Sequence, residues 1–439
     1  MFKNKLIFLS AIVIFIFFVT AGSCTAQSIT KGIQANISME GIKNKLGLMD
    51  SQKANLNLQQ QKLSTDLLEL TSADIITGNQ SRENLIKEMQ SLKQFRYYSS
   101  VREGVKQTDE QVYVYIHLAS NASTSVIEPY VQEVTDRDEQ NHLAVAWVSV
   151  TNLQTLANLD AVRSIRTVMP PYLKTGFVNS EGDAIHRADQ VRTQYSKNGS
   201  GIKVGIVSDG VDHWTSARDK GDLPSDLNVL SNTQGGDEGT AMLEIIHDLA
   251  PGAELYFHDY GDNVIAFNNA IDELVSAGCK IICDDVGWLT EPFFEDGVIA
   301  SHVASVIENN NITYVSSAGN DAQGHYQGMY HNDGYNFNDK PLYVDIPPKG
   351  NIIIVLEWTD KFGSSRNDYD LYLGDLVSQE IIDGSDYTQN GNDDPLEVIA
   401  GVNNGYSTIE GVILISNYRG LAATKTLEVY IYPGNGTFV

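Results

Sequence analysis

Cysteine is scarce in this 439-residue chain, which contains only three. Cys24 lies in the N-terminal segment discussed below, so Cys279 and Cys283 are left for the folded protein. We expect both on a single core strand, about 13 Å apart, which is too far for a disulfide bond. A metal site needs more ligands at closer spacing than these two thiols offer. The sequence therefore predicts two buried cysteines that act as small apolar side chains.

Positive charge is also scarce. The chain has 30 Lys and Arg against 56 Asp and Glu, which gives a formal net charge of −26. An acidic surface of this kind repels phosphate backbones and anionic lipids, so it argues against nucleic acid or an anionic membrane as partner. The remaining composition, with 42% hydrophobic and 9% aromatic residues, is typical of a globular protein. The length predicts about two to four domains.

The N-terminus has the pattern of an export signal. Two lysines precede an apolar run over residues 6–21, and small residues follow that run. The run is shorter than the roughly 20 residues of a membrane span and suits a cleaved signal peptide. We predict a signal peptide over residues 1–26, cleaved after Ala26, and a secreted or cell-surface protein. Lipidation of Cys24 and an uncleaved N-terminal anchor are the alternatives left open.

The segment that follows, residues 27–110, is rich in Gln, Asn, Lys and Leu and has no strand-like alternation. Four of its leucines, at spacings of seven, four and three, mark one apolar face of a helix: Leu56, Leu63, Leu67 and Leu70. A second helix is expected around Leu85, Met89 and Leu92. We predict a helical leader over this range.

Residues 111–170 alternate between strand-like and helix-like patterns. The expected strands cover residues 112–118, 142–150 and 162–171, and the expected helices cover 123–134 and 152–160. This order of elements fits a small α+β domain. Residues 171–200 have the polar, glycine-containing composition of a linker.

Residues 201–325 alternate apolar strands with helical patterns, which is typical of a parallel α/β sheet. After residue 325 the pattern changes to seven short strands separated by Gly, Asn and Asp turns, without helices. We therefore predict an all-β sandwich over residues 326–439, inserted into the α/β domain.

In this sandwich Asp368 and Asp370 share one strand face and Asp375 follows. We interpret them as a solvated acidic strand edge, with calcium binding as the alternative.

Three segments of the α/β region carry residues typical of catalysis. Residues 204–212 read VGIVSDGVD, residues 237–255 read DEGTAMLEIIHDLAPGAEL, and residues 312–321 read ITYVSSAGND. Together they resemble the subtilase family of serine peptidases. The resemblance implies a subtilisin-like parallel sheet with helices on both faces, incomplete in this sequence. It also implies that residues 111–170 are a ferredoxin-like propeptide, which acts as an intramolecular chaperone and inhibitor.

The resemblance assigns roles to three residues. Asp209 stands one position after the family's catalytic aspartate, where this chain has Ser208. A step of one residue along a strand turns the side chain to the other face, so Asp209 can act as the catalytic aspartate only if the strand has ended there. Glu238 stands in place of the catalytic histidine, at the start of an apolar helix. Asn320 matches the asparagine that donates to the oxyanion. Each residue has a structural alternative, namely a turn aspartate, a first-turn acid favoured by the helix dipole, and a turn asparagine.

A glutamate base resembles the sedolisins, which are subtilase relatives with a Ser-Glu-Asp triad that works in acid. Two carboxylates that share a proton have separated pKa values, so one stays basic at low pH. Sedolisins place their aspartate one helical turn after the glutamate, where this chain has Met242. The orienting acid would therefore be Asp209, or Asp237 next to the glutamate. We expect a lowered pH optimum.

The nucleophile of the family is missing from the sequence. No Gly-Thr-Ser-x-x-x-Pro segment occurs in residues 1–439, and the family places that segment after such a point in the chain. The resemblance implies a secreted subtilisin-like serine endopeptidase that cleaves by acyl transfer, inactive as given. The alternative is a non-catalytic pseudoprotease or a cell-surface adhesion protein. The partners implied are polypeptide substrates and the chain's own propeptide, and no cofactor is required, with calcium as the one ion its oxygen ligands could hold.

Overall fold

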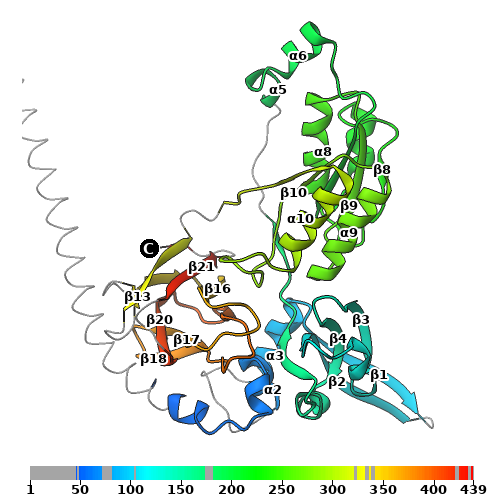
Figure 1. The fold of residues 1–439 in the computed structure, drawn as a ribbon. Helices are drawn as coiled ribbons and strands as arrows, with labels where there is room; N and C mark the ends of the chain where they lie inside the picture. The colour runs from blue at the N-terminus through cyan, green and yellow to red at the C-terminus, as the bar shows by residue number, and fades with distance from the viewer. Residues whose placement is uncertain are drawn as a thin grey trace, which may run out of the picture.

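The computed structural model describes most of the chain after residue 45 (Figure 1). The residues described are 46, 49–71, 82–102, 105–173, 181–320, 324–331, 336–337, 342–420, 425–433 and 437–438. The predicted signal peptide, with Cys24, lies outside them. The fold is mixed α/β, with one parallel sheet and several antiparallel sheets. Figure 1 shows the parallel sheet and its helices above, and the antiparallel sheets side by side below.

An antiparallel sheet forms the first domain. Its strands are β1 (Phe95–Arg102), β2 (Val105–Leu118), β3 (Glu133–Asp138), β4 (Leu143–Ser149) and β5 (Val162–Thr167). The order is β1-β2-β4-β3, and β5 pairs with the second half of β2. Strand β2 alternates between two cores, because Val114 and Ile116 face the N-terminal helices while Tyr113 and Tyr115 face the α/β domain.

Helices cover the outer face of this sheet. They are α2 (Thr65–Thr71), α3 (Arg82–Ser91), α4 (Leu153–Ala157) and the short 3-10 helices η1 (Gln60–Lys62), η2 (Thr124–Tyr130) and η3 (Val150–Asn152). The predicted leucine face is buried against the sheet, but it is not one helix, since Leu63 forms a β-bridge with Ile165. The helical leader predicted through residue 110 also needs correction. Its last part forms β1 and the start of β2. The helix predicted over 123–134 is shorter than expected, since η2 ends at Tyr130 and β3 begins at Glu133.

The α/β domain is built on a parallel sheet. Its strands are β7 (Lys203–Ser208), β8 (Asn228–Val229), β9 (Glu254–Asp259), β10 (Ile281–Asp284) and β12 (Thr313–Ser316), in the order β12-β10-β7-β9-β8. Helices α7 (Trp214–Lys220) and α8 (Glu238–Leu249) pack on one face. Helices α9 (Val264–Ser276) and α10 (Val298–Asn310) pack on the other. The prediction of a parallel sheet with helices on both faces is confirmed at this level.

The predicted linker, residues 171–200, contains secondary structure. Strand β6 (Tyr172–Leu173) pairs with β11 (Val286–Gly287) in antiparallel register, and α5 (Gly182–Ile185) and α6 (Ala188–Tyr195) follow.

Cys279 and Cys283, which precede β11 in the chain, are free thiols, as predicted. Only Cys283 lies on a strand, because β10 begins after Cys279. Burial raises the pKa of both thiols to about 11.

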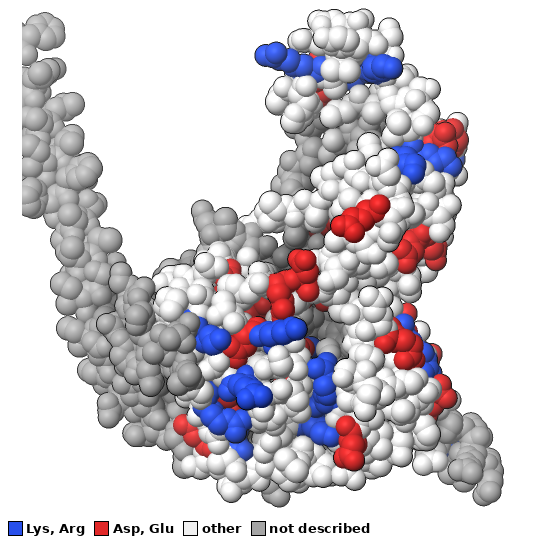
Figure 2. Space-filling model, viewed as in Figure 1, with Lys and Arg blue, Asp and Glu red and all other residues white. Residues whose placement is uncertain are grey.

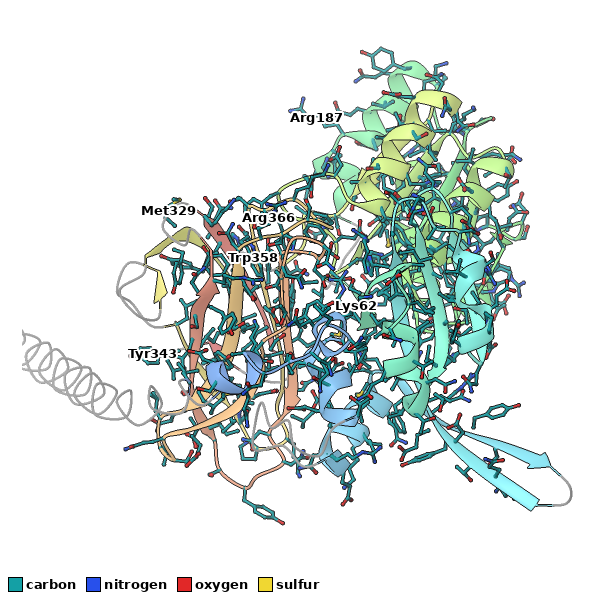
Figure 3. All side chains as sticks on the ribbon, turned by 60° about the horizontal axis from the view of Figure 1, so that its bottom comes forward. Lys62, Arg187, Met329, Tyr343, Trp358 and Arg366 are labelled. Atoms are coloured by element: carbon teal, nitrogen blue, oxygen red, sulfur yellow. The ribbon has the colours of Figure 1, made fainter. Side chains whose placement is uncertain are left out.

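A β-sandwich follows the α/β domain. One sheet has the order β14-β13-β21-β16-β19 and the other β18-β17-β20-β15-β22. The seven predicted strands are all present, as β15 (Leu342–Ile346), β16 (Asn351–Trp358), β17 (Asp368–Asp375), β18 (Glu380–Ser385), β19 (Leu396–Val402), β20 (Ile409–Arg419) and β21 (Thr426–Pro433). The structure adds β13 (His325–His331), β14 (Asn336–Phe337) and β22 (Thr437–Phe438). Trp358 is fully buried between the sheets, edge-on to Tyr369 (Figure 3).

The sequence suggested that the acidic strand of the sandwich is a solvated edge, and this interpretation is wrong. Strand β17 lies between β18 and β20, and the side chains of Asp368 and Asp370 are fully buried. Both carboxylates bind the ammonium group of Lys53 from the N-terminal segment. The leader therefore contacts the sandwich as well as the first sheet. Among the residues described, no helix is long and apolar enough to cross a membrane.

Candidate functional site

Carboxylates meet at the edge of the parallel sheet where its strands end. Strand β7 ends at Ser208, so Asp209 lies beyond the strand and turns toward the N-terminus of helix α8. Its Oδ1 accepts the backbone N–H of Glu238 at 2.9 Å and that of Gly239 at 3.3 Å. The structure thus brings Asp209 and Glu238 together. The carboxyl edge of a parallel sheet is where open α/β proteins bind ligands.

A glycine at position 236 makes room for the Asp209 side chain. Gly235 and Gly236 precede helix α8 with φ angles of +76° and +121°, in the left-handed region. A Cβ atom at Gly236 would lie 2.0 Å from Asp209 Oδ2. Only glycine fits there, because any side chain would overlap the carboxylate. The backbone of the Gly-Gly-Asp-Glu segment therefore lies close against the Asp209 side chain.

Glu238 and Asp285 have raised pKa values. Glu238 is half-buried in the first turn of α8, and burial together with the charge of Asp209 raises its pKa. Asp285 follows β10, is buried, and accepts a hydrogen bond from the Ser208 hydroxyl at 3.1 Å. Burial raises the pKa of Asp285 to about 7, and the charges of Glu238 and Asp284 add to the rise. Its other oxygen, Oδ1, has no hydrogen-bond partner among the described residues. We call Asp209, Glu238 and Asp285 the carboxylate cluster.

The neighbouring Asp284 has a structural role. Its Oδ1 accepts the Val286 backbone N–H at 3.1 Å and the Ser316 hydroxyl at 2.9 Å, which ties β10 to β12. Asp284 and Asp285 are both buried. Their burial leaves neither carboxyl group open to a basic side chain of a substrate.

The third predicted residue lies further away along the sheet edge. Asn320 is exposed and follows the end of β12, which is separated from β7 by β10. It stands at the same carboxyl edge as the carboxylate cluster. Its assignment as an oxyanion donor stays a prediction.

One histidine–carboxylate pair beside the cluster was missed in the sequence. His213 Nδ1 binds the carboxylate of Asp237, and its backbone N–H donates to the same side chain at 2.8 Å. This hydrogen bond raises the pKa of the exposed His213. The only signal in the sequence was a histidine four residues after Asp209. The pair supplies a second proton-carrying group next to Glu238.

The arrangement is suited to proton transfer. Within the described part of the chain, no three His, Cys, Asp or Glu side chains are placed to hold a metal ion. Calcium at Asp368 and Asp370 is also excluded in this arrangement, since the Lys53 ammonium occupies that position. Carboxyl groups with raised pKa values can give or take a proton near neutral pH. The cluster is therefore an acid–base site in its chemistry.

Comparisons with known proteins assign no family to the chain. No family model matches it, and no curated protein matches it. Among solved structures, AlgX of Pseudomonas aeruginosa is similar over 53% of this chain and 49% of AlgX, with 7% identity and a TM-score of 0.20. The VP2 subviral particle of infectious bursal disease virus is similar over 24% of this chain and 28% of that chain, with 18% identity and a TM-score of 0.16. The chain thus spans about half of AlgX and less of VP2.

The coupling within the cluster gives a direct prediction. The Asp285 carboxyl should titrate near pH 7, and Glu238→Gln should lower this midpoint because it removes a neighbouring negative charge. Carbon-13 NMR of labelled aspartate side chains measures the midpoint. Glu244→Gln is the matched control on the same helix, since Glu244 is not among the groups that act on Asp285. An Asp285 midpoint that Glu238→Gln leaves unchanged would contradict the coupling.

Proposed function

We propose that this chain carries the peptide-binding and acid–base part of a subtilase-like serine peptidase site. The observation that supports it best is the pairing of β6 with β11. Strand β11 begins directly after Asp285, and Leu173 and Tyr172 lie opposite Val286 and Gly287 in antiparallel register. A peptide segment of the chain therefore pairs with β11 in a two-stranded antiparallel sheet beside the carboxylate cluster.

Addition of a strand to a sheet edge is a common way to bind an extended peptide. Main-chain hydrogen bonds supply affinity without regard to sequence, and neighbouring pockets select side chains. In this proposal β6 is the peptide that the chain provides itself. The substrate takes the same path along β11 and passes the carboxyl end of β7, where Asp209 lies.

The first domain supports the propeptide part of the proposal. Its strand order β5-β2-β4-β3 is antiparallel throughout, with η2 and α4 in the two crossovers, which is the ferredoxin-like arrangement. This domain contacts the α/β domain, and in the chain it directly precedes β6. Asn263 caps α9 and donates to Asp136 at 2.8 Å, while the Tyr115 hydroxyl accepts the Val264 N–H at 3.3 Å. Such a domain would deliver the following segment to β11.

The proposed proton chemistry uses Glu238 as the general base and Asp209 as its partner. The pKa of Glu238 is raised, so it binds a proton more readily than an ordinary glutamate. Asp209 is held in place by the N–H groups of helix α8 and of Gly210. Asn320 would donate to the oxyanion. The nucleophilic serine has no counterpart in residues 1–439, so these residues alone should bind a peptide without cleaving it.

A peptide-exchange experiment tests this function. Leu173→Pro removes a backbone donor and weakens the pairing of β6, which should open β11. A fluorescent peptide with the sequence of residues 168–177 should then bind the variant at least tenfold more tightly than the unaltered chain. Fluorescence anisotropy measures both affinities, and mass spectrometry should find the peptide intact.

The control is Gly287→Pro in the same background, which blocks pairing along β11 and should abolish binding. Binding that is equal in all three chains would contradict a strand-addition site. Cleavage of the peptide that is lost on Glu238→Ala would show that the chain is active as it stands. That outcome would support the peptidase and overturn the expectation that these residues do not cleave.

One observation favours a second function, a non-catalytic peptide-binding protein. The contacts of Asp209 with three backbone N–H groups are those of a capping residue, which needs no substrate. Both functions predict the binding result above. They differ in proton transfer, because only the peptidase proposal requires Glu238 to be a carboxyl group.

A further inference from the structure

Lys53 is bound by the sandwich in a way that satisfies its whole ammonium group. The residue is 4% exposed, and its Nζ donates to Asp368 Oδ1 at 2.8 Å, to Tyr387 O at 3.0 Å and to Asp370 Oδ1. An ammonium group has three N–H donors, and all three are used. The Tyr418 ring lies 4.8 Å from Nζ and adds a cation–π contact. These are the features of a recognition site for an ammonium ion.

The pocket holds more carboxyl groups than one lysine can pair with. Besides Asp368 and Asp370, the buried carboxyl groups of Asp386 and Glu397 act on Lys53. Burial raises the pKa of Asp370, Asp386 and Glu397, as expected for carboxyl groups short of positive partners. Asp368 Oδ2 has no hydrogen-bond partner among the described residues. The sandwich is therefore incomplete without a cation at this position.

The residues of the pocket all belong to the sandwich, while the cation comes from a separate segment. Leu46, Met49 and Lys53 follow the spacing of one helix face. Leu46 and Met49 pack in one apolar cluster with sandwich side chains, namely Tyr372, Ile381, Val412 and Leu414. The segment thus contacts the sandwich as a helical peptide with a lysine and two apolar residues before it.

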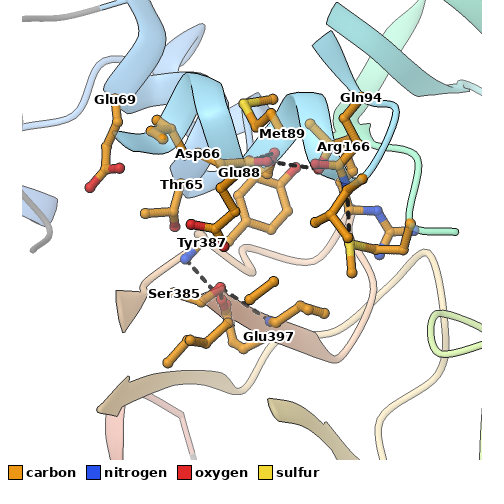
Figure 4. Close-up of a pocket in the computed structure, with 18 of the residues that line it drawn as sticks. Thr65, Asp66, Glu69, Glu88, Met89, Gln94, Arg166, Ser385, Tyr387 and Glu397 are labelled. Carbon is orange, nitrogen blue, oxygen red and sulfur yellow. Dashed lines mark hydrogen bonds between the residues drawn. The ribbon is translucent and has the colours of Figure 1, made fainter. Parts of the chain in front are cut away.

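A cavity of about 100 Å³ continues this interface toward the first domain (Figure 4). It lies between α2, α3 and the sandwich and shares Tyr387 and Glu397 with the Lys53 pocket. Thr65 closes one side, where its hydroxyl donates to Asp386 and accepts the Asp386 N–H at 3.0 Å. Figure 2 shows further acidic side chains at the surface where the sandwich meets the α/β domain. The interface between leader and sandwich thus combines apolar packing with buried polar contacts, and it is incompletely filled.

We propose that the sandwich carries a lysine-reading peptide site, and that Leu46 and residues 49–53 of this chain are its ligand. The ligand class is a helical segment with a lysine and apolar residues four and seven positions before it. The three acceptors and the ring select an ammonium group, because a planar guanidinium cannot place its donors on the same points. The segment is a removable ligand of a preformed pocket.

Chemical rescue tests the pocket in the full chain. Lys53→Ala leaves a space that matches propylammonium, which restores the lost atoms from Cγ to Nζ. We expect a saturable rise in the melting temperature of this variant with propylammonium, and none in the unaltered chain. Propylguanidinium should act at least tenfold more weakly. Lys53→Ala combined with Asp370→Asn should lose the rescue. A folded Lys53→Ala chain that does not respond to propylammonium would overturn the proposal.

Peptide binding tests the ligand class. A labelled peptide of residues 46–58 should bind the Lys53→Ala chain at least tenfold more tightly than its norleucine-53 counterpart. Equal binding of the two peptides would contradict lysine recognition. Should Lys53→Ala not fold, hydrogen exchange of Lys53→Met replaces it. Residues 49–58 should then exchange at least tenfold faster than in the unaltered chain while β16 and β21 stay protected, and unchanged protection of the segment would refute the proposal.

Discussion

Replacing Lys53 by methionine should destabilise the chain by about 3–5 kcal/mol, the typical result of removing one partner from a buried ion pair. The substitution keeps the length of the side chain and removes only the ammonium group. Asp368 and Asp370 then remain buried without their positive partner. Urea unfolding followed by circular dichroism measures the loss of free energy, and hydrogen exchange locates the first effect at residues 49–58, with β16 and β21 still protected.

The loss should be larger at pH 8 than at pH 5. Without the ammonium group the two carboxyl groups are neutral in the folded protein up to a higher pH than in the unfolded chain. The folded state then binds more protons, and its stability falls as pH rises. Lys87→Met is the matched control, because Lys87 pairs with Glu83 on an exposed face of α3 and should cost less than about 1 kcal/mol. Equal effects of the two substitutions would show that the buried ion pair does not stabilise the fold.

The burial of Lys53 could not be predicted from the sequence, although most of the sandwich could. The strands from β15 to β21 are marked by alternating apolar residues, which is a local signal. The same alternation placed Asp368 and Asp370 on the face opposite the apolar residues, and that face was read as solvated. Their partner lies 315 residues earlier, in a segment that contains only a single lysine among polar residues. Pairing over such a separation leaves no local pattern.

The first domain shows the same limit at its N-terminal edge. Strand β1 has no regular alternation of apolar and polar residues, and it pairs with a mostly polar stretch of β2, so neither has the pattern that marks a strand. The apolar half of β2, with Val114 and Ile116, was predicted because it lies between two cores. Burial on both faces thus made the apolar half of β2 recognisable as a strand in the sequence, whereas the hairpin of β1 and the start of β2 has no such apolar pattern.

At the site, the sequence placed Asp209 and Glu238 near each other through a resemblance to known peptidases. The geometry adds a physical reason, since β7 ends at Ser208 and Gly236 admits the Asp209 side chain. The role of Asp285 was not predictable in the same way. Its position after β10 was clear, but its contact with Ser208 depends on the pairing of β10 with β7.

A second buried ion pair joins the first domain to the sandwich. Arg166 on β5 binds the carboxylate of Asp394 and donates to His117 Nε2 at 3.0 Å. Burial and the neighbouring Arg166 charge lower the pKa of His117 to about 3, so its ring is neutral and can accept this bond. Burial alone would raise the pKa of Asp394, but the Arg166 guanidinium holds it below its usual value. The three side chains act as one unit between two domains.

Arg166→Met should therefore cost about 3–5 kcal/mol, because it leaves Asp394 buried and unpaired. Asp394→Asn should cost a similar amount, and the double variant should cost at least 2 kcal/mol less than the two losses combined, as expected for residues in direct contact. Arg163→Met is the control on the same strand. Arg163 also acts on Asp394 by its charge, but among the described residues its hydrogen bond goes to the Gly363 carbonyl and to no carboxylate, so its loss should cost about 1 kcal/mol. Urea unfolding of the four variants measures these energies. Losses that simply add would mean that the domains are held by their apolar contacts, and that Arg166 and Asp394 stabilise them independently.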